Sequence, residues 1–194
     1  GIRDRAREYG MDVVCFQGES VDRSRDSGLP LFPLNGHVPV DGAIILTATM
    51  IERNRAGDAK RFAEAFEGRP VVAIGNRLRG FPAILAKTRA PMRELMDHLL
   101  ADHGYRRFLY VGGPDGNSDN RLRESVFRAS LEEASARGDD CSGTVVTGGL
   151  FFESTGFTAL KEYVAAHPER DIDAVVAASD NTAVGALRVI RAYR

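Results

Sequence analysis

The sequence has little of the features that would assign it at once to a specialised class of protein. Only two cysteines occur in 194 residues, which excludes a disulfide-built scaffold and favours the cytoplasm. The 26 basic and 27 acidic side chains nearly cancel, and a net charge of −1 argues against a domain built mainly to coat DNA or anionic lipid. No apolar run approaches the ~18–20 residues of a membrane span, and the charged residues 1–10 do not resemble a signal peptide.

Motifs for catalysis, cofactors and metals are missing as well. The glycine-rich turn 112–116 has neither the dinucleotide-binding nor the P-loop spacing, and no G-x-S-x-G elbow occurs. Neither Cys15 nor Cys141 has a histidine nearby in the sequence. His98 and His103 are five residues apart, so an α-helix would not place them on one face as it does i, i+4 ligands. We therefore expect no enzyme, no cofactor and no metal site.

Apolar periodicity predicts an α/β fold. Seven short apolar runs read as strands, at 12–16, 42–46, 71–74, 83–86, 108–111, 144–147 and 174–178. Helical patterns lie between or beside them, at about 2–9, 59–66, 91–103, 119–136, 153–166 and from 180 onward. Strands linked by helices form parallel sheets, and near-continuous apolar strands are covered on both faces. A division near Gly104 predicts two doubly wound lobes, residues 1–104 and 105–194.

The helical patterns also predict which faces are buried. The first helix is expected to turn Ile2, Ala6 and Tyr9 to one face. The last is expected to bury Ala183, Leu187 and Ile190, with Asp180 or Asn181 as its cap.

In open α/β sheets ligands bind beyond the carboxyl ends of the strands. The polar residues predicted there are Gln17, Thr47, Asn76, Lys87, Asp115, Thr147, Ser179 and Asp180. Arg123 lies early in the helix that follows such an end, and Phe151 and Phe152 follow another. An aromatic ring, an arginine and an aspartate that converge would suit a sugar or another small polyol. The alternatives are a capping role for Asp180, a solvated surface role for Arg123 and a core role for Phe151.

Five segments resemble the LacI/GalR-type sensor domains of bacterial regulators. Residues 92–134 resemble that family's central signature: a helix ending in His-Leu, a strand, a Gly-Pro turn and a helix bearing an arginine. The other four segments are 40–46, 69–75, 147–160 and 173–190. The first helix and residues 92–104 look closer to a branch in which the sensor is fused to signalling outputs such as histidine kinases or diguanylate cyclases.

The resemblance implies a type I periplasmic-binding-protein-like fold of two lobes, with a ligand cleft between them and no catalytic role. Arg123 and Asp180 match ligand-contacting residues of the family, and Phe151 matches its aromatic wall. The family's first strand would precede Gly1 and later strands would follow Arg194, so we expect a fragment of a longer chain. The family members dimerise, and they reach DNA through a domain absent here.

Four positions depart from the family pattern. Val126 replaces a glycine, Ser179 replaces an asparagine, and Lys87-Thr88 stands where Asp-Asn is usual. The last change reverses a charge and favours an anionic or phosphorylated ligand over a plain sugar. We therefore expect a cytoplasmic, homodimeric sensor of a small polar effector. The rivals are a transporter's solute-binding protein and a Rossmann-like nucleotide-sugar enzyme, for which no cofactor fingerprint occurs.

Overall fold

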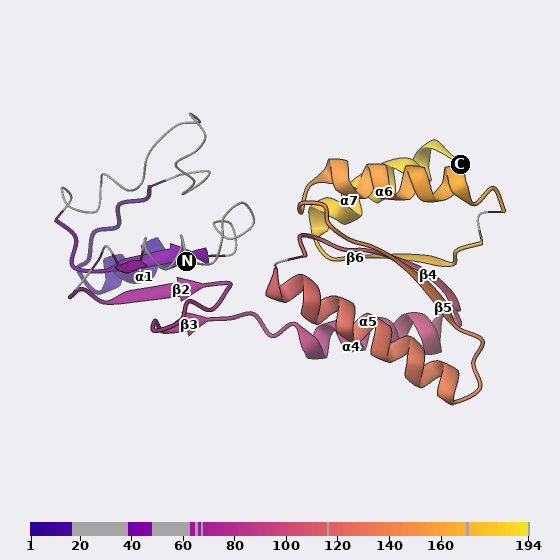
Figure 1. Cartoon of the computed structure of the whole chain (residues 1–194). Coiled ribbons are helices and arrows are strands. Elements are labelled where there is room, and N and C mark those ends of the chain that lie inside the picture. Colours follow the sequence, from indigo (N-terminus) through magenta and orange to yellow (C-terminus); the bar gives the residue numbers. More distant parts are fainter. Residues whose placement is uncertain are drawn as a thin grey trace. The chain divides into compact units, whose positions relative to one another are not determined.

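The computed structural model describes residues 1–16, 39–47, 63–64, 66, 68–115, 117–169 and 171–193. They form two compact units, Gly1–Ile84 and Leu85–Arg194. Each contains a parallel sheet of three strands, which confirms the predicted α/β class (Figure 1). None of the described helices is long and apolar enough to cross a membrane.

The first unit is built around a small parallel sheet of order β1-β2-β3. Its elements are α1 (Ile2–Glu8), β1 (Ala43–Leu46), β2 (Val71–Ile74) and β3 (Ala83–Ile84). A small core gathers on this sheet from Ile45, Ala63, Val71, Ala73 and Leu78. The predicted first helix is present as α1, and no residue of it is buried.

The strand predicted over 12–16 and the helix predicted over 59–66 also belong to this unit. Residues 12–16 form no strand, and Val14 remains 63% exposed. β-branched residues alone do not make a strand, because a strand needs a partner for its backbone and a surface for its side chains. The predicted helix over 59–66 lies mostly outside the described residues, as does Gln17.

The second unit is a three-layer sandwich with sheet order β5-β4-β6. Helices α4 and α5 cover one face of the sheet, and α6 and α7 cover the other (Figure 1). Its elements are α4 (Arg89–Asp97), the π-helical turn η2 (His98–Asp102), β4 (Arg107–Val111), α5 (Ser118–Ala136), β5 (Ser142–Val146), α6 (Glu153–Ala166), β6 (Ala174–Ala177) and α7 (Asp180–Ala192).

Strand β4 is buried after Arg107 because its next four residues serve both layers. Phe108 and Tyr110 pack with α4 and α5, whereas Leu109 and Val111 pack with α6 and α7. All four are at most 2% exposed. Successive side chains of a strand point to opposite faces, so a strand covered on both sides needs an unbroken apolar run.

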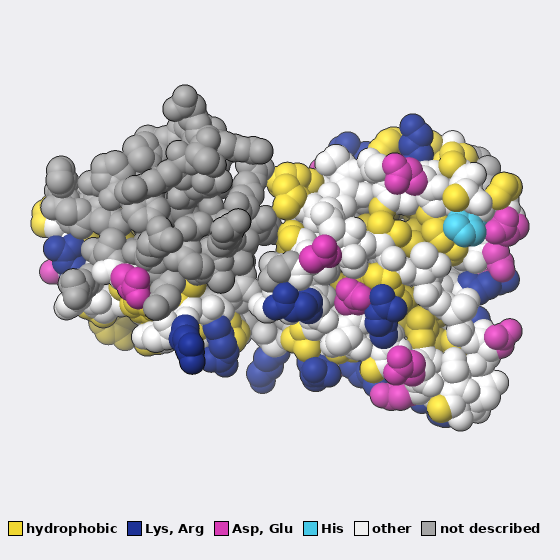
Figure 2. All heavy atoms as spheres, in the orientation of Figure 1, with side chains coloured by type: hydrophobic (Ala, Val, Ile, Leu, Met, Phe, Trp, Pro, Cys, Tyr) yellow, Lys and Arg dark blue, Asp and Glu magenta, His cyan; other side chains and the backbone are white. Residues whose placement is uncertain are grey.

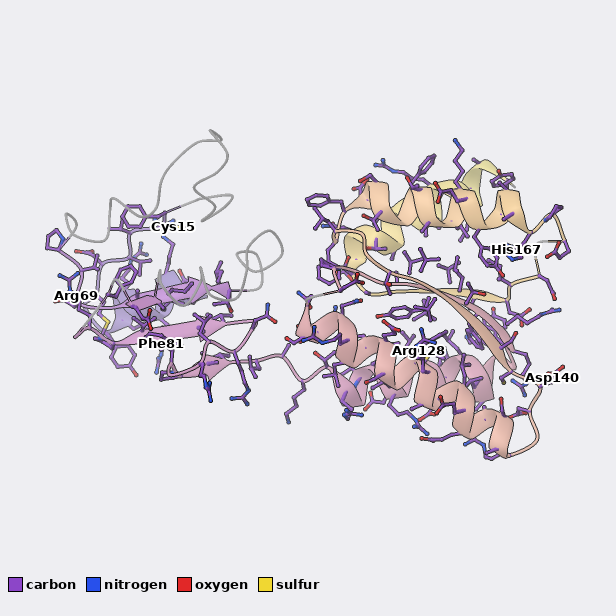
Figure 3. All side chains as sticks on the ribbon, in the orientation of Figure 1. Cys15, Arg69, Phe81, Arg128, Asp140 and His167 are labelled. Atoms are coloured by element: carbon purple, nitrogen blue, oxygen red, sulfur yellow. The ribbon has the colours of Figure 1, made fainter. Side chains whose placement is uncertain are left out.

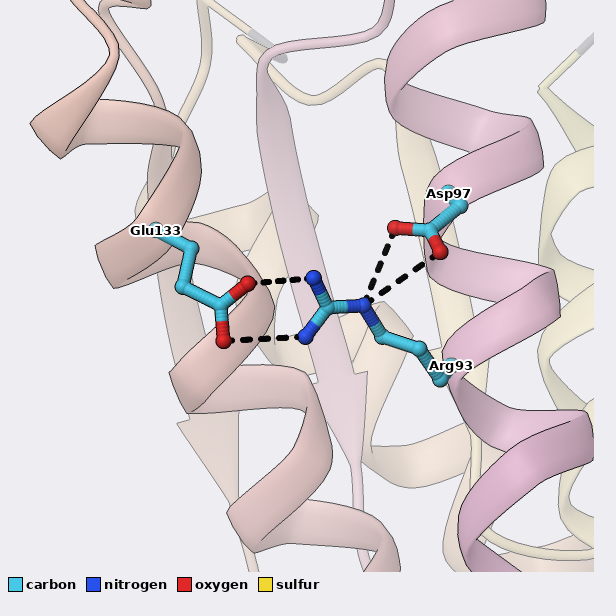
Figure 4. Close-up of polar contacts among 3 residues, drawn as sticks. All are labelled: Arg93, Asp97 and Glu133. Carbon is cyan, nitrogen blue, oxygen red and sulfur yellow. Dashed lines mark hydrogen bonds and ion pairs between the residues drawn. The ribbon is translucent and has the colours of Figure 1, made fainter.

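Helix α4 belongs to the second unit, because the boundary between the units lies after Ile84 and not near Gly104, where the sequence pattern predicted it. Its Met92 and Met96 are buried in the same cluster as Phe127 of α5. Arg93 of α4 also forms hydrogen bonds with Glu133 of α5: its Nη1 donates to one carboxylate oxygen at 2.9 Å and its Nη2 donates to the other (Figure 4). Its Nε donates to Asp97 of the same helix at 3.0 Å. Hydrogen bonds from Arg93 lower the pKa of the Glu133 carboxyl.

Helices α6 and α7 cross at close range through two glycines. A Cβ at Gly156 would overlap the carbonyl of Thr182, and one at Gly185 would overlap the carbonyl of Glu153. The buried residues of α7 are Thr182, Gly185, Ala186 and Val189. The predicted inward face of Ala183, Leu187 and Ile190 is therefore wrong, since all three are exposed. Close approach selects small residues here, and hydrophobicity alone pointed to the wrong side of the helix.

The end of α4 differs from an ordinary helix. The helix widens into η2, where the amide of His103 donates to the carbonyl of His98 at 3.2 Å, five residues back. This wider turn brings the two imidazoles together, with their Nε2 atoms 3.0 Å apart. The expectation that His98 and His103 do not share a face is therefore wrong, because it assumed an unbroken α-helix.

Candidate functional site

The candidate site is the carboxyl edge of the second unit's sheet, formed by the residues that follow β4, β5 and β6. These residues are 112–118 except the undescribed Gly116, 147–152 and 178–180. All three strands run parallel, so their carboxyl ends meet at one edge. Backbone bonds hold the loops together: the Gly112 amide donates to the Val146 carbonyl at 2.7 Å, and the Ala178 amide donates to the Val111 carbonyl at 2.9 Å.

Arg123 lies in the second turn of α5 and reaches across to the end of β6. Its Nη1 donates a hydrogen bond to the carbonyl of Ala178, just before Ser179 and Asp180. A guanidinium carries five N–H donors, so this bond leaves others for a ligand. Arg123 is half-buried, and Arg121 is exposed and donates instead to the carbonyl of Asp115 at 3.0 Å.

Asn120 fixes the glycine turn after β4. Its side chain is 1% exposed; it accepts a hydrogen bond from the Gly113 amide at 2.8 Å and donates to the Gly113 carbonyl at 3.3 Å. The Tyr110 hydroxyl donates to the same amide oxygen at 3.4 Å. Burial raises the pKa of this hydroxyl well above its ordinary value, which keeps it protonated as a donor. Sequence reasoning missed Asn120, although an asparagine in the first turn after a Gly-Pro turn is a recognisable signal.

Phe151 lies against this turn. A Cβ on residue 113 would overlap this ring, so the ring can occupy this position only because residue 113 is glycine. The ring packs partly buried against the core beneath α4 and α5. The carbonyl of Phe151 accepts a hydrogen bond from the side chain of Asn181 at 3.3 Å, which ties the β5–α6 loop to the start of α7. The structure thus brings Arg123, Phe151 and Asp180 to one edge, through contacts that link three separate loops.

Asp180 does not cap its helix. Ser179 is the N-cap residue, and its hydroxyl accepts from the Thr182 amide at 3.2 Å and bonds the Thr182 hydroxyl at 2.8 Å. The expectation that Asp180 or Asn181 provides the cap is wrong, because Ser179 already satisfies the first-turn amide. The Asp180 side chain is exposed at the carboxyl edge. Its carboxylate is thereby available to other partners.

The other predicted site residues differ in their burial and in their hydrogen bonds. In the first unit Thr47 is fully buried; its hydroxyl accepts from the Asn76 amide at 2.8 Å and bonds the carbonyls of Ile74 and Asn76. That hydroxyl therefore joins the ends of β1 and β2. Asn76 is 5% exposed beside it. Asp115 and Thr147 are exposed on the second unit's edge, and Lys87 is exposed before α4.

The opposite, amino edge of this sheet is occupied by internal ion pairs. A hollow of about 400 Å³ there is lined by Gly104, Tyr105, Arg106, Arg107, Asp140 and Asp173 (Asp140 is labelled in Figure 3). The Asp173 carboxylate accepts both backbone amides of Arg106 and Arg107, at 2.8 and 2.9 Å, and these bonds lower its pKa. Arg107 also pairs with Asp171 and Asp173. These charges neutralise one another and serve the fold, so the carboxyl edge remains the candidate.

The face of the second unit drawn in Figure 2 carries acidic and basic side chains intermixed between apolar ones. This distribution agrees with the near-zero net charge of the chain. A surface that binds DNA directly collects one sign of charge on one face. The described part of this face is not organised in that way.

Residues 96–194, just over half of the chain, match the family model of the periplasmic binding protein-like domain. The chain belongs to this family. The HTH-type transcriptional regulator CelR of Thermobifida fusca is 36% identical over 93 residues, which cover 48% of this chain and 26% of that protein. The resemblance to LacI-type sensor domains seen in the sequence is confirmed by these matches.

Solved structures share the fold. A LacI transcriptional regulator from a Rhodococcus species matches with a TM-score of 0.73 and 26% identity, over 100% of this chain and 66% of that one. The Cra transcriptional dual regulator from Pseudomonas putida, in complex with fructose 1-phosphate, matches with a TM-score of 0.75 and 21% identity, over 98% of this chain and 66% of that one. The chain spans less than two thirds of the length of these relatives.

Proposed function

We propose that this chain is the effector-sensing domain of a bacterial LacI-type transcriptional regulator or related signalling protein. It would bind a small polar metabolite at the carboxyl edge of the second unit and pass the binding energy to an output domain. The observation that carries this proposal is that Arg123 on α5, Phe151 before α6 and Asp180 at the start of α7 lie at one edge of the sheet, where hydrogen bonds link their elements. A ligand shifts such a protein only through different affinities for its conformations, so the contacts made at this edge decide the response.

The groups at this edge suit a hydroxylated ligand. A half-buried guanidinium and an exposed carboxylate can fix hydroxyl groups or a phosphate by charge-assisted hydrogen bonds. A partly buried aromatic ring can stack on the apolar face of a sugar. The ligand class we propose is therefore a sugar or a related polar metabolite.

The helix starts favour a phosphorylated sugar within that class. The N-cap residues of α5 and α7, Asn117 and Ser179, supply capping side chains, whereas Phe152, the N-cap residue of α6, does not. The first amides of an uncapped helix attract anionic groups, and in α6 the Thr155 amide already donates to the Phe152 carbonyl at 3.1 Å. Together with Arg123 they support a phosphate ester as ligand. In the P. putida protein, which has the same fold, the ligand is fructose 1-phosphate.

We propose that the protein works in the cytoplasm as a homodimer, reaches DNA only through another domain, and catalyses no reaction. The relatives named above are transcriptional regulators, which supports a sensing role over an enzymatic one. The alternative is the solute-binding protein of a transporter, which would use the same edge for capture without passing a signal to an attached output.

A thermal-shift screen of the chain against matched pairs of neutral sugars and their phosphate esters tests the proposal, beginning with fructose and fructose 1-phosphate. A ligand present at 100 times its Kd stabilises the folded state by about 2.7 kcal/mol and raises Tm. We expect a phosphate ester to raise Tm more than its neutral parent. If no sugar or sugar phosphate changes Tm at millimolar concentration, the proposed ligand class is wrong.

A further inference from the structure

A pair of histidines at the end of η2 forms a contact that none of the proposed sensing chemistry uses. His98 and His103 face each other with their Nε2 atoms 3.0 Å apart, and their rings meet edge to face with centroids 4.6 Å apart. His98 is about half exposed and His103 is exposed, so both are accessible from solvent. We propose that these two imidazoles form a surface site for a divalent transition-metal ion of the Ni²⁺ and Cu²⁺ type.

The contacts around the pair orient the donor atoms. Nδ1 of His98 bonds the Asp102 carboxylate at 2.7 Å, so this nitrogen carries the proton and Nε2 keeps its lone pair. A carboxylate behind a metal-binding imidazole is the usual means of fixing its tautomer and raising its basicity. The ring of His103 stacks on Tyr105 at 5.0 Å, which holds the plane of the second ligand.

Two imidazoles at this distance form a stable contact only while one ring donates an N–H hydrogen bond to the other. With His98 Nε2 as the acceptor, His103 is the donor in the metal-free protein. A shift of the His103 proton from Nε2 to Nδ1 turns both Nε2 atoms into free lone pairs. Side chains exposed on the surface can make the accompanying small ring rotation at low cost.

The two nitrogens are close enough to share one metal ion after a small ring movement. With metal–nitrogen bonds of ~2.0–2.1 Å, two ligands lie about 2.9 Å apart at a right angle and about 3.3–3.4 Å apart in a tetrahedron, and the two Nε2 atoms are 3.0 Å apart in the metal-free protein. Imidazole suits Cu²⁺ and Ni²⁺, and both bind nitrogen sites more tightly than Mn²⁺, Fe²⁺ or Co²⁺.

The position in the helix also favours a cation. Helix α4 continues into η2, and the pair lies at the carboxyl end, where the helix dipole is negative. The guanidinium of Arg106, which follows the pair in the sequence, donates to the Leu100 carbonyl at 2.9 Å and pairs with Asp139. No group of three or more potential metal ligands gathers in the described part of the chain, so water or an external ligand would fill the remaining positions.

Calorimetric titration of the chain with NiCl₂ tests the site, with MgCl₂ as the control salt. We expect one Ni²⁺ equivalent to bind and Mg²⁺ not to bind, because magnesium prefers oxygen ligands. His98→Gln and His103→Gln should each weaken Ni²⁺ binding at least tenfold. Asp102→Asn should weaken it by about tenfold or somewhat more, as expected for a residue that only orients a ligand.

The matched control is His167→Gln, on α6, where the ring stacks on Tyr163 and bonds its carbonyl. This variant should bind Ni²⁺ like the unmodified chain. A Cu²⁺ spectrum from electron paramagnetic resonance should show two equatorial nitrogens in the unmodified chain and fewer in either histidine variant. The proposal is overturned if His98→Gln/His103→Gln binds Ni²⁺ as tightly as the unmodified chain, or if His167→Gln causes the same loss.

Discussion

The crossing of α6 and α7 makes the second unit sensitive to a single methyl group. Gly185→Ala would place a Cβ 2.7 Å from the carbonyl carbon of Glu153 and 2.8 Å from the amide nitrogen of Phe157. Atoms of this kind prefer separations of roughly 3.5–4.0 Å, so the helices would have to separate by about 1 Å. The obstacle is backbone, and no side-chain rotation can relieve it.

The expected cost follows from what the separation disturbs. Ala159, Leu160, Ala186 and Val189 form the core between these helices and Leu109 and Val111 of β4. A gap of 0.5–1 Å already forfeits a quarter to a half of each dispersion contact. Overpacking of this kind costs about 1–3 kcal/mol, and the helix propensity of alanine returns up to about 1 kcal/mol. We predict a net destabilisation of about 1–2 kcal/mol.

Urea denaturation followed by far-UV circular dichroism measures this change, because the long described helices all belong to the second unit. The control is Val184→Ala, the neighbouring exposed position, which should change the free energy of unfolding by less than about 0.5 kcal/mol. If Gly185→Ala unfolds at the same urea concentration as the unmodified chain, the close crossing does not exist as described.

Two further predictions concern groups that hold the second unit together. Asn120→Ala leaves the Gly113 backbone and the Tyr110 hydroxyl without their buried partner. It should lower the free energy of unfolding by about 1–3 kcal/mol in the same urea denaturation assay. An unchanged midpoint would contradict the described hydrogen bonds. The folded-state pKa of Asp173 is lowered, so its contribution is present above its unfolded pKa of about 3.9 and is lost as the pH falls through the folded value. The acid-induced fall in Tm between about pH 5 and pH 2 should therefore be shallower in Asp173→Asn, and identical pH profiles would show that Asp173 is not coupled to folding.

The strands and helices of the second unit could be predicted well from the sequence. A strand buried on both faces shows as an unbroken apolar run, and helix α6 was predicted with the bounds that the structure has. The strand over 12–16 was predicted wrongly because its side chains fit a strand, but nothing in a local pattern shows whether a partner strand is present.

Three features depended on tertiary contacts. The buried face of α7 is set by two glycines that meet another helix's backbone, and hydropathy gives glycine no weight. The contact between His98 and His103 depends on a π-helical turn, which no periodicity of 3.6 residues predicts. The bond from Arg123 to the Ala178 carbonyl joins residues 55 positions apart in the sequence. The site residues themselves could be nominated because carboxyl ends of parallel strands share an edge.

The central claim is that Arg123 and Asp180 bind the effector at the carboxyl edge. Calorimetric titration with the ligand found by thermal shift, on the unmodified chain and on Arg123→Ala, Asp180→Ala and Arg128→Ala, tests it most directly. Arg128 lies on the same helix as Arg123 but is exposed and pairs with Glu124 (Figure 3). A hydrogen bond to a charged group contributes about 1.5–3 kcal/mol, so each of the first two changes should weaken binding at least about tenfold, with little change for Arg128→Ala. Unchanged affinity in Arg123→Ala and Asp180→Ala, with both variants folded, would contradict the account.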